Sequence, residues 1–251
     1  MIGNVINKLN SELPATVRLV AVSKFHPFEA IEEAYAVGQR VFAESRPQEL
    51  LAKVRRLEEV RAKRVEEAIV SGGDVEAAKA YMSDVEWHFI GHLQTNKLKM
   101  VLPYVSLVQS VDSVRLLDAI QTWGAANSKV ISVLLEPHVA AEESKQGFVA
   151  EEIYDILSRT VDSAGGQSVA YSNISFRGIM GMATFTDDQS VVASDFAALR
   201  GIFETCRSRF PQLAPDFKEL SIGMSDDYPL AIEYGSTMIR VGSMIFGERN
   251  Y

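Results

Sequence analysis

The feature that most constrains the fold is a regular alternation of short apolar runs with longer amphipathic stretches. Short runs rich in β-branched and apolar residues are typical of buried strands, and strands that alternate with helices favour a parallel sheet. We predict eight strands, at Arg18–Val22, Arg40–Ala43, Glu86–Ile90, Val105–Ser110, Lys129–Leu135, Ile174–Met180, Glu219–Ile222 and Met238–Val241.

The stretches between these runs have apolar residues at helical spacing. We predict helices over Phe28–Val37, Pro47–Val70, Ser113–Trp123, Val149–Ser163, Val191–Phe210 and Asp227–Glu233, with a brief helical turn at Thr95–Met100. Eight such units within 251 residues favour an α/β fold closed into a (β/α)8 TIM barrel. The alternative is an open doubly wound sheet. Its first strand would normally lead into a glycine-rich phosphate turn, whereas this chain has Ser23-Lys24-Phe25-His26-Pro27 there.

One segment interrupts the alternation. Residues 61–83 are rich in Lys, Arg, Glu and Ala and contain Gly72-Gly73, so they are expected to form a helical hairpin on the surface. No linker rich in Pro, Gly or Ser divides the chain, and we therefore expect residues 1–251 to form a single domain.

Charge and composition narrow the possible partners and location. The formal net charge of −8 argues against a surface that binds nucleic acid or an anionic membrane. Cys206 is the only cysteine, so an internal disulfide is impossible and a reducing compartment is expected. No apolar run approaches the roughly 20 residues that span a bilayer. We expect a cytoplasmic protein with no membrane partner.

Lys24 is the most informative single residue. It follows the apolar run Leu19-Val20-Ala21-Val22-Ser23, where an ammonium group is costly to bury. A lysine amine kept neutral by apolar surroundings can attack a carbonyl and hold it as a Schiff base. The alternative is that the Lys24 side chain only extends past the barrel end into solvent.

The residues after the seventh and eighth predicted strands are suited to a phosphate group. Ser221, Gly223 and Ser225 precede the helix predicted from Asp227, and Gly242-Ser243 follow the last strand. Barrels frequently bind phosphate in these two loops, where glycine admits the anion and serine donates to it. The alternative is that Ser225 serves only as the N-cap of the helix.

Arg240 lies inside the eighth predicted strand, between apolar neighbours. Its guanidinium requires a partner, which is a carboxylate, a carbonyl or a ligand ring nitrogen. His88 and His92 have a spacing of four residues, but the first lies in a strand pattern and Gly91 intervenes, so a zinc site is not expected.

Seven segments, in order along nearly the whole chain, together resemble the family of pyridoxal phosphate homeostasis proteins, which are similar to the N-terminal domain of alanine racemase. The segments are Leu19-Val-Ala-Val-Ser-Lys24, Phe42-Ala-Glu-Ser-Arg-Pro-Gln-Glu49, Trp87-His-Phe-Ile-Gly-His-Leu-Gln-Thr-Asn-Lys97, Ser144-Lys-Gln-Gly147, Arg177-Gly-Ile-Met180, Leu220-Ser-Ile-Gly-Met-Ser-Asp-Asp227 and Gly235-Ser-Thr-Met-Ile-Arg-Val-Gly-Ser-Met-Ile-Phe-Gly247.

This resemblance implies a barrel of the alanine racemase type with pyridoxal 5′-phosphate (PLP) held as a Schiff base on Lys24. By motif position, Ser221, Gly242 and Ser243 would hold the phosphate, with Ser225 a nearby candidate, and Arg240 would face the pyridine nitrogen.

The chain departs from the family pattern at two positions near the expected cofactor. The family usually reads Gly-Glu-Asn where this chain has Ala43-Glu44-Ser45, so the hydroxyl of Ser45 replaces an amide beside the cofactor. His92 replaces a common proline and is expected to add a hydrogen-bond donor at the rim of the site.

The resemblance leaves three functions to compare. The first is a PLP carrier that supplies PLP-dependent apo-enzymes, acts as a monomer and has little catalytic activity. The second is an amino-acid racemase, which would need a second proton-transfer group. In the racemases that group is a tyrosine of an additional C-terminal domain, and this chain ends at Tyr251, shortly after the last predicted strand. The third is a class I aldolase, which would be colourless where a PLP imine is yellow. The sequence favours the carrier.

Overall fold

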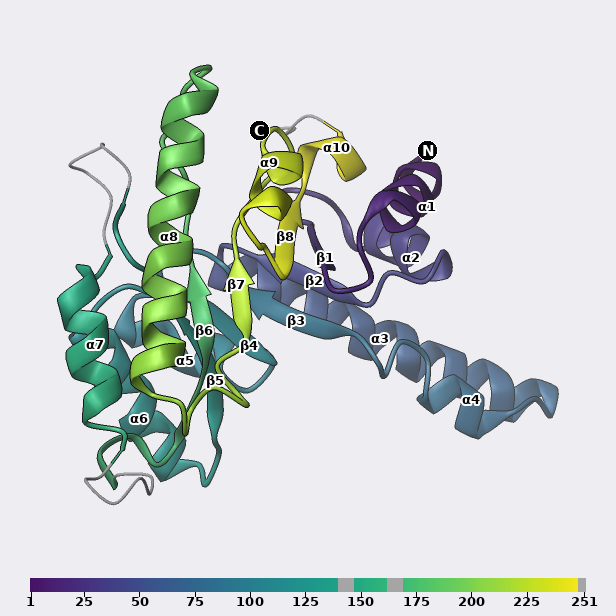
Figure 1. The fold of residues 1–251 in the computed structure, drawn as a ribbon. Helices are drawn as coiled ribbons and strands as arrows, with labels where there is room; N and C mark the ends of the chain where they lie inside the picture. Colours follow the sequence, from purple (N-terminus) through teal and green to yellow (C-terminus); the bar gives the residue numbers. More distant parts are fainter. Residues whose placement is uncertain (140–146, 162–168, 248–251) are drawn as a thin grey trace.

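The computed structural model describes residues 1–139, 147–161 and 169–247. Within these residues, eight parallel strands pair in sequence order and close into a barrel, because β1 also pairs with β8 (Figure 1). The predicted barrel is confirmed, and the open-sheet alternative is wrong. The strands are β1 (Arg18–Val22), β2 (Val41–Glu44), β3 (Glu86–Phe89), β4 (Leu107–Val111), β5 (Ile131–Leu135), β6 (Ile174–Met180), β7 (Glu219–Ser221) and β8 (Met238–Val241).

Alternation along each strand divides the core into two layers. One set of side chains fills the barrel interior, and the opposite set packs under the surrounding helices. The interior cluster is small and aliphatic. It consists of Val20, Val22, Val41, Ala43, Leu107, Leu134, Met180 and Met238. Polar side chains are buried as well, among them His88, Gln109, Ser221 and Arg240.

Helices cover the outside of the barrel, and most lie where the apolar spacing predicts them. The helices are α1 (Ile2–Glu12), α2 (Phe28–Ala36), α3 (Pro47–Ser71), α4 (Val75–Lys79), α5 (Leu98–Val101), α6 (Val114–Ala126), α7 (Ala150–Ser158), α8 (Gln189–Arg209), α9 (Tyr228–Glu233) and α10 (Ser243–Phe246), with short 3-10 turns η1 (Thr95–Lys97) and η2 (Val169–Tyr171).

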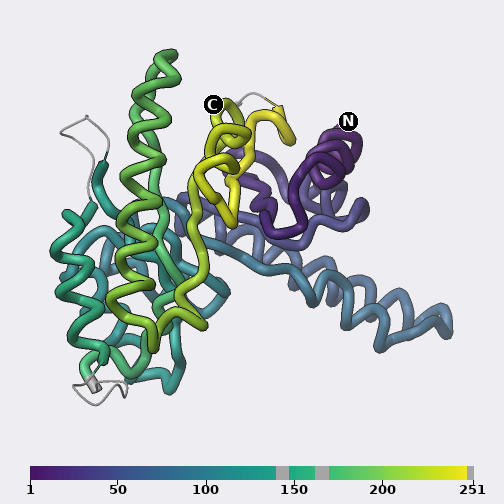
Figure 2. Tube along the Cα trace, in the orientation of Figure 1, coloured from purple at the N-terminus to yellow at the C-terminus, as the bar shows by residue number. Residues whose placement is uncertain are grey.

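In the segment 61–83, α3 continues to Ser71 and α4 follows at Val75–Lys79, so the chain turns back on itself as a helical hairpin. Gly72 ends α3 in the left-handed conformation, with φ of 70°, which glycine adopts without strain. Asp74 then caps α4 through the backbone N–H of Ala77. Figure 2 shows that the tip of this hairpin extends well away from the barrel. At its base, Arg61 donates to the carbonyls of Tyr81 and Met82.

The two ends of the described chain meet on one side of the molecule. Helix α1 packs against both α2 and α10, next to the pairing of β1 with β8. None of the helices in the described ranges is both long and apolar enough to cross a membrane.

Candidate functional site

The carboxyl ends of the eight strands meet at one end of the barrel, because the strands are all parallel. Lys24 leaves β1 at this end, and Ser45 leaves β2 beside it. On the other side of β1, Gly242 follows β8. A Cβ atom at position 242 would lie 3.1 Å from the carbonyl oxygen of Val22, so glycine lets these two chain segments approach closely. Lys24 is therefore flanked by the exits of β2 and β8.

The backbone just after Lys24 adopts an unusual conformation that its neighbours hold in place. Phe25 has φ of 67°, in the left-handed region that a non-glycine residue rarely adopts. Its N–H donates to Glu49 Oε2 at 2.8 Å, and the guanidinium of Arg46 lies 4.4 Å from the centroid of its ring. His26 stacks on Phe246 of α10, with 5.2 Å between ring centroids. These contacts fix the loop that presents Lys24.

A buried ion pair lies behind the same loop. Glu44 is fully buried and Lys53 nearly so, and the Lys53 ammonium binds Glu44 Oε1 and the carbonyl of Ser23. Ser23 Oγ also donates to Glu44 Oε1 at 2.6 Å. Burial raises the pKa of the Glu44 carboxyl, while the charge of Lys53 opposes that rise. The pair anchors the residue that precedes Lys24.

Ser225, Gly242 and Ser243 form a cluster between the loops after β7 and β8. Ser243 Oγ donates to Ser225 Oγ at 3.1 Å, and the N–H of Gly242 donates to the same oxygen at 3.4 Å. The interpretation of Ser225 as a helix N-cap is wrong. Helix α9 starts at Tyr228 with Asp227 as its N-cap, and Asp227 accepts from the N–H of Met224.

Arg240 is buried inside the barrel and is held by oxygen atoms. It donates to the carbonyl and hydroxyl of Ser221, both at 2.7 Å, and to the carbonyl of Gly181 at 2.9 Å. Among the described residues Arg240 forms no ion pair. Of the partners considered from the sequence, carbonyl groups are therefore the ones that it contacts within the protein. Burial lowers the pKa of the guanidinium to about 10, which still leaves it protonated at neutral pH.

Ser221 has a different environment from the other three predicted phosphate residues. It is fully buried, accepts from Arg240 and donates to Gln109 Oε1 at 2.7 Å. The amide nitrogen of Gln109 lies 2.9 Å from His88 Nδ1. His88, Gln109, Ser221 and Arg240 thus form a chain of hydrogen bonds through the barrel interior, which we call the interior chain. The hydroxyl of Ser221 is committed to this chain.

The two departures from the family pattern lie on neighbouring loops. Ser45 is half-buried, and its carbonyl oxygen would be 2.1 Å from a Cβ at Gly91, so only glycine fits there. His92 is largely exposed and pairs through Nδ1 with Asp112 Oδ2 at 2.8 Å. No group of three or more His, Cys, Asp or Glu side chains that could hold a metal ion occurs among the described residues.

Sequence reasoning did not single out two residues near the site, and part of one family-like segment lies outside the described residues. Lys53 lies on the buried face of α3 together with Leu50, Val54 and Leu57. Its place within this apolar stripe could have indicated a buried lysine. Gln109 gave no signal within its strand. Residues 140–146, which include Ser144 of the fourth family-like segment, lie outside the described residues.

The comparisons with known proteins show which family the chain belongs to. The model of the alanine racemase N-terminal domain matches residues 2–250. The chain belongs to this family. It is 32% identical over 234 residues to a pyridoxal phosphate homeostasis protein of Aquifex aeolicus, across 93% of this chain and 88% of that one. The human protein of the same name is 36% identical over 247 residues, across 96% and 80% of the two chains. These relatives place the chain among the pyridoxal phosphate homeostasis proteins.

Solved structures extend the similarity to three dimensions. PipY of Synechococcus elongatus, solved with PLP bound, superimposes with a TM-score of 0.79 at 30% identity, covering 98% of this chain and all of PipY. Alanine racemase of Corynebacterium glutamicum gives a TM-score of 0.66 at 12% identity, and this chain covers 60% of it. The racemase similarity extends to the fold alone.

Proposed function

We propose that this chain binds PLP covalently through Lys24 and serves in PLP homeostasis, as a carrier with little catalytic activity of its own. The names of its relatives and the PLP bound to PipY support the ligand. The observation that carries the proposal is the convergence at the β1–β8 junction. Lys24 follows β1, Ser225 follows β7, Gly242 and Ser243 follow β8, and the buried Arg240 lies on β8 itself.

The residues present fit the three chemical parts of PLP. Lys24 supplies an amine that condenses with the aldehyde carbon, with loss of one water molecule. Ser225, Ser243 and the N–H of Gly242 supply donors for the phosphate. The predicted phosphate role of Ser221 is less well supported, because its hydroxyl already serves the interior chain.

Arg240 supports a carrier more than a catalyst. PLP supplies an electron sink for amino-acid chemistry, and that sink is strongest when the pyridine nitrogen is protonated. Arg240 is a cation with no acceptor, and its partners in the protein fix its orientation. A guanidinium facing the ring nitrogen would therefore disfavour the protonated ring and weaken the sink.

Three further parts of the proposal concern the protein's cellular context. We propose that PLP-dependent apo-enzymes receive the cofactor, that the carrier is a monomer, and that it acts in the cytoplasm. Light scattering during size-exclusion chromatography tests the monomer. A transfer assay from the loaded protein to an apo-enzyme, with and without a dialysis membrane between them, tests whether delivery needs contact.

Substitution of the lysine tests the covalent link directly. We expect the wild-type protein, soaked in PLP and reduced with borohydride, to gain the mass of one reduced PLP adduct, which peptide mapping places on Lys24. Lys24→Ala should give no adduct, because the substitution removes the amine that forms the imine. Lys99→Ala, which removes an exposed lysine, is the matched control and should retain the adduct. A full-yield adduct in Lys24→Ala would refute the assignment.

A second substitution tests the phosphate cluster. Ser243→Ala should weaken PLP retention by about 1–3 kcal/mol, because it removes a hydroxyl donor to an anion. Equilibrium dialysis measures the affinity, with pyridoxal, which lacks the phosphate, as the control ligand. Pyridoxal binding should be unchanged. Equal PLP affinity in the variant and the wild type would remove Ser243 from the site.

A further inference from the structure

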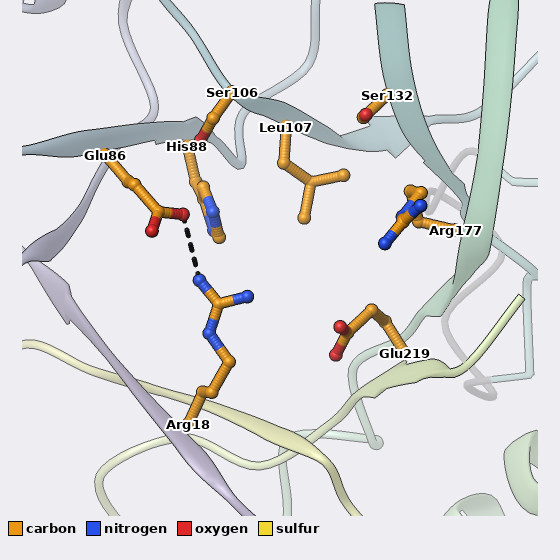
Figure 3. A pocket seen from close by; sticks show the side chains of 8 residues that line it. All are labelled: Arg18, Glu86, His88, Ser106, Leu107, Ser132, Arg177 and Glu219. Atoms are coloured by element: carbon orange, nitrogen blue, oxygen red, sulfur yellow. Dashed lines mark hydrogen bonds and ion pairs between the residues drawn. The ribbon is translucent and has the colours of Figure 1, made fainter. Parts of the chain in front are cut away.

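A second polar cavity lies at the opposite end of the barrel from Lys24. Its volume is about 300 Å³, near the lower limit for small-molecule pockets. Arg18, Glu86 and Glu219 line it, and each is the first residue of its strand (Figure 3). The cavity therefore opens at the amino ends of the strands, which the proposed PLP site does not use.

The charged side chains around this cavity are of both signs. Two guanidinium groups, of Arg18 and Arg177, and two carboxylates, of Glu86 and Glu219, line it (Figure 3). Arg18 pairs with Glu86 at 3.0 Å, and Arg177 pairs with Asp216 at 2.9 Å. The lining offers hydrogen-bond donors and acceptors in balance, and its net charge is zero.

Glu219 is the most unusual of these groups. It is only 8% exposed, and its carboxylate accepts from the neutral hydroxyl of Thr237 at 3.1 Å. Within residues 1–139, 147–161 and 169–247, no cation forms an ion pair with it. A buried carboxylate is costly without a cationic partner. Figure 3 shows the Glu219 side chain directed into the cavity, where a ligand ammonium would meet it.

His88 adds a donor to the same cavity. The interior chain fixes which ring nitrogen of His88 carries the proton. Ser221 donates to Gln109 Oε1, so the Gln109 amide nitrogen donates to His88 Nδ1, and the proton of the neutral imidazole lies on Nε2. No described residue pairs with Nε2. Burial lowers the pKa of His88 to about 3, so the ring stays neutral. An unpaired N–H thus lies on an imidazole that lines the cavity.

These groups discriminate among small ligands. An anion would gain from Arg18 and Arg177 but would be repelled by Glu86 and Glu219, and a cation would meet the reverse. A zwitterion can satisfy both sets. We propose that this cavity binds an α-amino acid with a small side chain. Its ammonium donates to Glu219, and its carboxylate accepts from Arg177 and the N–H of His88.

Titration calorimetry with glycine, L-alanine and L-serine tests the proposal on the wild type and on Lys24→Ala. Both proteins should bind at least one of these probes saturably at up to millimolar concentration. Acetate, ethylamine and inorganic phosphate, which carry charge of one sign, should bind at least tenfold more weakly. Binding that is lost in Lys24→Ala would locate the probe at the other end of the barrel and overturn the proposal, as would tighter binding of phosphate.

Substitutions then identify the cavity. Glu219→Gln and Arg177→Gln should each weaken amino-acid binding at least tenfold, while Glu58→Gln, an exposed carboxylate on α3, should not change it. Arg177 is partly exposed, so its substitution should preserve the fold, and thermal unfolding checks both variants. Unchanged affinity in folded Arg177→Gln, or no saturable binding by either parent protein, would refute the site. These outcomes do not depend on whether PLP binds Lys24.

Discussion

At the scale of single residues, the protein places polar groups where a barrel interior usually has apolar ones. In the interior chain, Gln109, Ser221 and Arg240 each fill a position in the core. Each also forms a hydrogen bond with the next member of the chain. Buried polar networks stabilise one specific arrangement only when every member is satisfied. His88, at the start of this chain, is therefore a sensitive reporter of the interior.

His88 should make the stability of the protein depend on pH. Its folded pKa of about 3 lies below the ordinary imidazole value of 6.5, mainly because of burial and then because of the charge of Arg18. Between these values the unfolded state binds the proton more readily, so the free energy of unfolding falls as the pH drops below 6.5. The slope is about 1.4 kcal/mol per pH unit, or roughly 2 kcal/mol by pH 5.

Urea unfolding at pH 7 and pH 5 measures this dependence. His88→Gln should flatten it, because the amide does not titrate. His92→Gln, which changes an exposed imidazole, should leave it as in the wild type. An equally steep dependence in His88→Gln would show that other groups cause it.

The location of a residue could be predicted from the sequence when the strand next to it was enough to place it. The positions of Lys24, Gly242 and Ser243 at one end of the barrel could be predicted because these residues follow buried strands, and the ends of barrel strands are where sites form. Ser221 could not be separated from them, because its sequence does not reveal that its hydroxyl binds Gln109, a residue 112 positions away. The pairing of Lys53 with Glu44 likewise depends on how α3 packs on β2.

At the scale of elements, two glycines show how local backbone geometry decides which substitutions a strand or helix tolerates. Gly178 in β6 has φ of 150°, and a Cβ there would lie 1.8 Å from the carbonyl oxygen of Glu219 in β7. Gly201 lies in α8, with no atom within 4 Å of the place its Cβ would take. The first glycine is required for strand pairing, and the second only weakens a helix.

Alanine substitutions at these two glycines should therefore change the stability of the protein in opposite directions. Gly178→Ala should destabilise the protein by more than about 4 kcal/mol, because the β6–β7 pairing must separate. Gly201→Ala should stabilise it by about 0.5–1 kcal/mol, because alanine is the better helix former. Chemical denaturation measures both. A Gly178→Ala variant as stable as Gly201→Ala would mean that the strands can shift to make room.

Most elements were predictable because their apolar periodicity is strong, and the errors lie at their ends. The strand predicted from Lys129 begins at Ile131, because the N–H of Lys129 donates to the carbonyl of Gly124 near the end of α6. The helix predicted from Asp227 begins at Tyr228, since Asp227 caps it. Hydrogen bonds between neighbouring elements set these limits, and periodicity does not record them.

At the scale of the whole molecule, closure of the barrel decides whether a site exists. β1 pairs with β8 from Arg18 to Ala21, and this pairing brings the loops after both strands together. Removal of residues 236–251 should leave β1 and β7 with unpaired edges and abolish the PLP adduct, because open edges disrupt the sheet and promote aggregation. Mass spectrometry after borohydride reduction and light scattering measure the two effects.

The projecting hairpin provides the matched control. Replacing residues 66–78 with a short Gly-Ser turn removes a comparable length of chain but keeps the contacts of Arg61 with Tyr81 and Met82. Adduct formation should persist, since this tip lies away from the barrel (Figure 2). Loss of the adduct in the hairpin deletion would instead assign the tip a role in the site.

The junction of the first and last strands also has a consequence for biosynthesis. During translation, the lysine that follows β1 emerges long before the serine that follows β8, so a growing polypeptide has the proposed reactive amine without the proposed anion-binding serine. In the proposed PLP site, capture of the vitamin-derived aldehyde should therefore await release of the chain from the ribosome, which would make the loaded protein a marker of completed synthesis.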